Sequence, residues 1–231
     1  MEVLTEKKYY TYHTQNLVPT KLKINSEIFV KEISKFNFIP WGDVHLEFPR
    51  YAVPLINEDG IFKENDPACY PLDRWNFLLE YPQFKYKEWT DDHLIKWKEW
   101  NSREIDMDSI VNEKHFKVPT DALKISSLSA LSELSPYMYR SCILKWDYLG
   151  HFKKHIDTWH PTQWIKLWGT TNPDGMVIRY EKDGKMVSES HIEQGRFYLH
   201  DSIKPHEGLA FADDVYQFFI SLNPRALDVL W

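Results

Sequence analysis

The sequence predicts a mainly β protein of the α+β class. A double-sheet jelly roll over residues 137–224 is flanked by a helix- and loop-rich region over residues 1–136. Two observations lead to this prediction. From about residue 137, short runs rich in β-branched and aromatic residues alternate with turns. Two of the turns, at 172–175 and 182–185, contain an Asp-Gly pair, a strong signal for a tight turn. Closely spaced strands joined by tight turns are typical of a sandwich or barrel, and 231 residues suit a single domain.

The flanking region contains fewer predicted elements. Residues 51–56 form a short apolar run that ends at the turn signal of residues 57–60, which predicts a strand. The stretch 61–89 is rich in Pro and aromatic residues, so we expect an ordered loop there. Three segments are predicted as helices from their capping residues and the spacing of their apolar residues: 26–34, 90–100 and 120–134.

The jelly roll itself is predicted from runs of strand-forming residues. They cover residues 140–147, 163–170, 176–181, 186–193, 196–200 and 215–222.

The composition excludes several classes of protein. The net charge is −6 and no basic block stands out, which argues against a protein that follows a nucleic-acid backbone. No apolar run approaches the ~18 residues that a membrane span needs, and the first residues lack the apolar core of a signal peptide. The two cysteines, Cys69 and Cys142, form no Cys-x-x-Cys pair, so we expect reduced thiols rather than a zinc site. These observations predict a cytoplasmic protein with no membrane partner.

One constellation carries chemistry. His155-Ile156-Asp157 places an imidazole and a carboxylate two positions apart, and residues i and i+2 of an extended strand share a face. His206 follows, shortly before the last predicted strand. Two histidines and one carboxylate are the facial triad of non-haem iron(II) oxygenases, which leaves coordination positions open. His200 is a rival for the distal position, but it lies inside a predicted strand. The competing interpretation is that His155 and His206 are ordinary surface or hydrogen-bonded histidines.

Residues 140–223 resemble the double-stranded β-helix, a cupin-like jelly roll, of the iron(II)/2-oxoglutarate-dependent oxygenases. Within that superfamily they are most similar to the aspartyl/asparaginyl β-hydroxylase and prolyl-hydroxylase-like branch. The resemblance lies in the segments RSCILKWDYLGHFKKHIDT, IKLWGTTNPDGMVIRY, IEQGRFYLHDSIKPHEG and DVYQFFISLN. It implies an oxidoreductase in which His155, Asp157 and His206 bind iron(II). It also implies 2-oxoglutarate and dioxygen as co-substrates, and hydroxylation of a peptide side chain or a small molecule.

The sequence departs from this family on the last predicted strand. Family members usually place an Arg or Lys there to bind the 2-oxoglutarate carboxylate, whereas this chain has Asp-Val-Tyr-Gln at 214–217. The carboxylate must then be bound from elsewhere, and Arg is the better fork for it. Our candidates are Arg179 first, then Lys166 and Arg140, with Tyr216 as a hydrogen-bond donor. Arg50 and Arg74 of the flanking region are weaker candidates for contact with an anionic substrate.

Two alternatives remain open. The chain could be a cupin-type metal enzyme that does not use 2-oxoglutarate, which the absent basic residue favours. It could also be a non-catalytic jelly roll that binds a sugar or ring, which the 10 Trp residues would suit. Trp146, Trp164 and Trp168 lie on predicted strands and could form the wall of a pocket.

Overall fold

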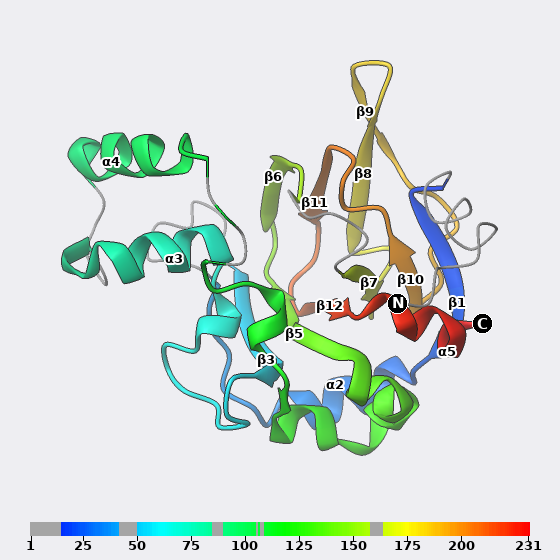
Figure 1. Cartoon of the computed structure of the whole chain (residues 1–231). Helices are drawn as coiled ribbons and strands as arrows, with labels where there is room; N and C mark the ends of the chain where they lie inside the picture. Colours follow the sequence, from blue (N-terminus) through cyan, green and yellow to red (C-terminus); the bar gives the residue numbers. More distant parts are fainter. Residues whose placement is uncertain (1–14, 42–49, 85–89, 105, 107–108, 158–163) are drawn as a thin grey trace.

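Two β-sheets packed face to face form the centre of the protein in a computed structural model (Figure 1). The structure describes residues 15–41, 50–84, 90–104, 106, 109–157 and 164–231. Within these residues, the larger sheet runs in the order β1 (Leu17–Lys23), β10 (Arg196–His200), β7 (Ile165–Thr170), β12 (Val215–Leu222), β5 (Met138–Trp146), β3 (Arg50–Asn57), β2 (Ile39–Pro40), and β4 (Val118–Pro119) also pairs with β3. The smaller sheet runs in the order β6 (His151–His155), β11 (His206–Ala210), β8 (Met176–Lys182), β9 (Lys185–Ser188). From β5 onward the chain passes back and forth between the sheets, which makes the fold a jelly roll.

The outer face of the larger sheet is covered by helices (Figure 1). Helix α2 (Ser26–Ile33) begins at Asn25, whose side chain accepts hydrogen bonds from the backbone N–H groups of Glu27 and Ile28. Its buried Phe29 ring lies 4.9 Å from the ring of Phe218 on β12. Phe197 on β10 is at the same 4.9 Å from Phe218, so three aromatic rings join α2 to two strands.

A long 3-10 helix, Ser126–Tyr137, covers the same face beside α2. We predicted an α-helix over 120–134, and this prediction is wrong in type. The buried residues Leu128, Leu131 and Leu134 recur every third position, and three residues per turn is the period that aligns them on one side. Shorter 3-10 helices lie at Pro67–Cys69, Pro82–Phe84, Glu113–His115, Asp121–Lys124 and Pro224–Ala226, and the short helix α5 spans Leu227–Leu230.

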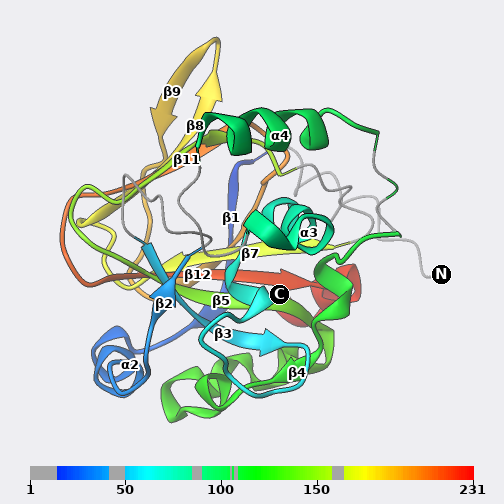
Figure 2. The same cartoon turned by 90° about the vertical axis from the view of Figure 1, so that its left-hand side faces the viewer.

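Helices α3 (Leu72–Glu80) and α4 (Asp91–Asn101) lie on the same side of the larger sheet as the smaller sheet (Figure 2). They have an apolar cluster of their own, separate from the main core. In it the Phe77 ring meets the Trp97 and Trp100 rings edge to face. Of the helices that the structure describes, none has the length and apolar character needed to cross a membrane.

The predicted jelly roll is confirmed, and most of its strands lie where the sequence placed them. In the β8–β9 hairpin Asp183 and Gly184 have φ of 51° and 75°, the two positive values that the Asp-Gly signal predicts for a type I′ turn. Strands β1, β2, β4, β6 and β11 and helix α5 lie outside the ranges predicted as strands or helices, and α3 lies within the stretch 61–89 that was expected to be a loop. Strand β11 is short and contains Glu207 and Gly208, and it gains its extended form from pairing with β6 and β8 on both sides.

Phe218→Ala should lower the free energy of unfolding by about 3–5 kcal/mol, because the ring is fully buried among aromatic neighbours and its removal leaves a cavity. Urea denaturation measures this. Phe211→Ala is the matched control, since that ring is 51% exposed and its loss should change stability by less than about 1 kcal/mol. Equal losses in the two variants would contradict the packing described.

Candidate metal centre

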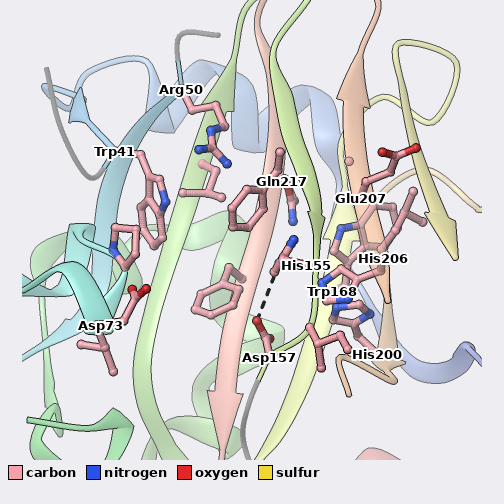
Figure 3. Close-up of a pocket in the computed structure, with 18 of the residues that line it drawn as sticks. Trp41, Arg50, Asp73, His155, Asp157, Trp168, His200, His206, Glu207 and Gln217 are labelled. Atoms are coloured by element: carbon pink, nitrogen blue, oxygen red, sulfur yellow. Dashed lines mark ion pairs between the residues drawn. The ribbon is translucent and has the colours of Figure 1, made fainter. Parts of the chain in front are cut away.

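His155, Asp157 and His206 come together on the smaller sheet, at the side that faces the larger sheet (Figure 3). His155 is the last residue of β6 and His206 the first of β11, and the two stand directly opposite each other in the antiparallel pair. Asp157 lies two residues beyond the strand, where its backbone N–H donates to the Ser202 carbonyl at 2.9 Å. His155 and Asp157 are thus close in the sequence, and His206 joins them as the strand partner of His155.

The spacing of the three side chains suits one metal ion. Their candidate ligand atoms lie within 4.8 Å of one another, and His155 Nε2 is 3.7 Å from Asp157 Oδ1. Bonds of about 2.1 Å to a common ion bring adjacent ligand atoms to about 3 Å, so the side chains need to move inward by about an ångström. Among the residues that the structure describes, these are the His, Cys, Asp or Glu side chains that lie close enough together, three or more at a time, to hold a metal ion.

Backbone carbonyls orient both imidazole rings. His155 Nδ1 lies 2.8 Å from the Lys153 carbonyl oxygen, and His206 Nδ1 lies 2.8 Å from that of Lys204. A carbonyl oxygen only accepts, so each Nδ1 carries the proton and each Nε2 presents a lone pair. Metal-binding histidines are typically fixed in this manner by a second hydrogen bond.

The electrostatics keep His155 ready to bind a cation. Burial, with a smaller contribution from His206, lowers the pKa of His155 to about 4, although Asp157 acts in the opposite direction. The imidazole is therefore neutral near pH 7, which metal binding requires.

His200 is not part of this group but lies beside it. Its ring is 4.6 Å from the His206 ring and nearly perpendicular to it. Its Nδ1 is hydrogen-bonded to the hydroxyl of Tyr180, and burial lowers the pKa of His200 well below its usual value. The preference for His206 over His200 agrees with this geometry. His200 is itself buried, with 5% of its surface exposed, and it lines the cavity described next.

A cavity of about 540 Å³ opens at the triad between the two sheets. The larger sheet contributes Trp146, Trp168 and Gln217, and the smaller sheet contributes Met176 and Ile178. Helices α3 and α4 also contribute lining residues, which include Asp73, Arg74, Trp97 and Asn101. Trp146 and Trp168 therefore line the pocket as the sequence suggested, whereas Trp164 is not among the lining residues.

Two of the candidate carboxylate-binding residues belong to a buried ionic cluster. Lys166 Nζ lies 2.8 Å from Glu113 Oε1, and Arg140 Nε lies 3.2 Å from Glu113 Oε2. Burial opposes ionisation of Glu113, but Arg140 and Lys166 together keep its pKa below the usual value. Arg140 also lines the cavity, while Lys166 does not. Ser221 completes the cluster with hydrogen bonds to both Lys166 and Glu113.

The other two candidates point away from the cavity. Strand β8 places Ile178 in the cavity lining, so its neighbour Arg179 lies on the opposite face, where it pairs with Glu207 at 3.0 Å. Tyr216 likewise lies on the helix-covered face of β12, with its ring 5.8 Å from that of Phe29. The structure thus brings neither residue to the triad.

Sequence reasoning missed Gln217 and Trp41 and gave Arg50 little weight, although all three line the cavity. A signal for Gln217 was present, since it is a polar residue within the otherwise apolar stretch of β12. Arg50 had no such signal, because its place depends on the pairing of β3 with β5, between segments far apart in the sequence.

His155→Ala, Asp157→Ala and His206→Ala should each weaken the affinity for cobalt(II) by more than about 100-fold. Loss of a residue that only hydrogen-bonds to a metal ligand typically weakens metal affinity by about 10–100-fold, and loss of a ligand itself should cost more. The visible absorption of bound cobalt(II) measures this. His191→Asn is the control, since His191 is exposed and Asn tolerates its φ of 65°. Unchanged binding in any triad variant would remove that residue from the site.

Glu113→Gln should lower the free energy of unfolding by about 3–5 kcal/mol, because it leaves the buried cations Arg140 and Lys166 without their carboxylate. The ionised form of Glu113 is favoured in the fold, so its contribution is present above pH 4.5 and is lost as the pH falls through the depressed pKa. Denaturation of parent and variant at several pH values measures both effects. A surface control, Asp121→Asn, removes an exposed pair with Lys124 and should cost less than about 1 kcal/mol.

No protein-family model matches this chain, and no curated protein matches it. Solved structures show a distant likeness. A 2OG-Fe(II) oxygenase family oxidoreductase from Burkholderia pseudomallei is 9% identical, with a TM-score of 0.37 over 80% of this chain and 71% of that one. A prolyl hydroxylase from Trichoplax adhaerens, solved with a peptide fragment of the hypoxia inducible factor oxygen degradation domain, is 12% identical, with a TM-score of 0.44 over 97% and 94%. An RmlC-like cupin from Desulfovibrio desulfuricans is 9% identical, with a TM-score of 0.27 over 37% and 72%.

Proposed function

We propose that this protein is a non-haem iron(II), 2-oxoglutarate-dependent dioxygenase that hydroxylates a peptide side chain or a small molecule. The observation that carries the proposal is the triad of His155, Asp157 and His206 in the lining of a cavity inside a jelly roll. Its two imidazoles are already fixed with Nε2 available.

The donor set favours iron(II) over other common metals. Two nitrogen ligands and one carboxylate on one side of an ion form the facial triad, and the remaining positions stay open for exchangeable ligands. Cys69 and Cys142 are both buried free thiols that do not line the cavity, so they add no soft ligand. When bound, iron(II) would supply the activation of dioxygen, coupled to oxidative decarboxylation of the 2-oxo acid.

The protein's own residues would bind and orient the reactants and exclude water. Phe152, Trp146 and Trp168 give the cavity apolar walls beside the triad. Such walls lower the local dielectric and strengthen each polar contact within the site. We place the primary substrate against the cavity residues on α3 and α4. These residues combine charge (Asp73, Arg74) with an indole ring (Trp97).

One observation favours a second candidate, a cupin-type metal enzyme that does not use 2-oxoglutarate. The residues on β12 that line the cavity are the neutral Gln217 and Phe219, where the resemblance leads one to expect a cation. An enzyme of this kind would use the same triad without the 2-oxo acid.

Anaerobic addition of iron(II) and 2-oxoglutarate should produce a weak visible charge-transfer band in the parent protein. Admission of oxygen should then yield succinate. His155→Ala and Asp157→Ala should abolish both signals, and His191→Asn should retain them. Iron binding without the band or succinate would support the cupin-type enzyme. Absence of iron binding would reject both candidates and leave a non-catalytic jelly roll.

A further inference from the structure

Buried polar side chains from three neighbouring strands of the larger sheet face the cavity next to the triad. Arg50 on β3 is 6% exposed, Trp146 on β5 is fully buried, and Gln217 on β12 is 8% exposed. Arg50 stands directly opposite Trp146 in the β3–β5 pair, and Gln217 stands opposite Leu144 in the β5–β12 pair. Strand alternation therefore directs all three side chains toward the smaller sheet.

Several polar atoms of this wall have no hydrogen-bond partner among the residues that the structure describes. They are the indole N–H groups of Trp41, Trp146 and Trp168 and the amide oxygen of Gln217. Buried polar groups in folded proteins are nearly always hydrogen-bonded, and exceptions call for an explanation such as a ligand. Here all four atoms belong to residues that line one cavity, so a ligand rich in oxygen atoms would satisfy the indole donors.

Arg50 supplies a cation to the same wall. Its guanidinium carbon lies 4.2 Å from the centre of the Phe152 ring and 5.4 Å from that of Trp146. The Phe152 ring is in turn 3.9 Å from the His155 ring, so Arg50 is one ring away from the triad. Figure 3 shows the Arg50 and Gln217 side chains extending from their strands into this space. A guanidinium carries several N–H donors in a fork that fits a carboxylate, so it can bind one alongside contacts that it already makes.

We propose that Arg50, with Trp146 and Gln217, forms a carboxylate subsite for a ligand whose other end reaches the triad. This inference rests on the proposed function. The ligand is a 2-oxo acid with a second, distal carboxylate, and Arg50 binds that distal carboxylate. The other basic candidates fit this role less well. Arg140 and Lys166 are paired with the buried Glu113, and Arg179 lies on the outer face with Glu207.

The test is calorimetric titration of manganese(II)-loaded protein with two probes. 2-Oxoglutarate has the distal carboxylate, and 2-oxopentanoate has the same chain length without it. Arg50→Gln should weaken 2-oxoglutarate binding by at least about 30-fold, since it truncates one partner of a buried charge pair. The same variant should change 2-oxopentanoate binding by less than about threefold. Arg179→Gln, the matched control, should bind both probes like the parent.

Equal weakening of both probes in Arg50→Gln, or an unchanged preference for 2-oxoglutarate, would overturn the subsite. If Arg50→Gln does not fold, Arg50→Lys decides, because it keeps the charge and removes the fork. A selective loss of about tenfold for 2-oxoglutarate supports the subsite, and no selective loss overturns it. If neither 2-oxo acid binds the metal-loaded parent, the proposed function fails. Glutarate, which has no keto group to chelate a metal, then tests the subsite alone. Binding to the parent but not to the Arg50 variant supports it, and any other result overturns it.

Discussion

The antiparallel pairing of β6 with β11 sets His155 opposite His206, and the candidate site depends on this register. In a strand pair, a shift by one residue turns every side chain to the other face of the sheet. Such a shift would leave Asp157 with one histidine instead of two. The hydrogen bond from Asp157 N–H to the Ser202 carbonyl ties the segment after β6 to the segment before β11, so the carboxylate is positioned by the same pair of segments.

The basic residues on the inner face of the larger sheet lie in two different environments. Arg140 and Lys166 lie with Glu113 in a cluster that is almost wholly buried, where charge is compensated within the protein. Arg50 lies between aromatic rings at the cavity. Burying a cation is tolerated when a carboxylate or an electron-rich ring face offsets the lost hydration. Glu113 therefore compensates the charge of Arg140 and Lys166, whereas aromatic ring faces lie against the guanidinium of Arg50.

The fold, and the grouping of His155, Asp157 and His206, could be predicted from sequence because both depend on local patterns. The strands follow from runs of β-forming residues, and His155 and Asp157 are two positions apart. Which charged and polar residues of the strands face the cavity could not be predicted, because their orientation depends on which face each strand buries. Arg179 and Ile178 are adjacent and point to opposite faces, as do Tyr216 and Gln217. The composition of β8 and β12 does not reveal which member of each pair faces inward until the sheets are paired. The helix predicted over 120–134 was wrong in type because a leucine at every third position fits the 3-10 period as well as part of an α-helical stripe.

The separate apolar cluster of α3 and α4 has a consequence for how the protein can change over evolution. Phe77, Trp97 and Trp100 stabilise the two helices largely through contacts with each other. The same helices present Asp73, Arg74 and Asn101 to the cavity. None of these three residues belongs to the main apolar core or to the triad. The cavity lining on the helix pair can therefore change by small steps while the residues of the main core and of the triad stay the same.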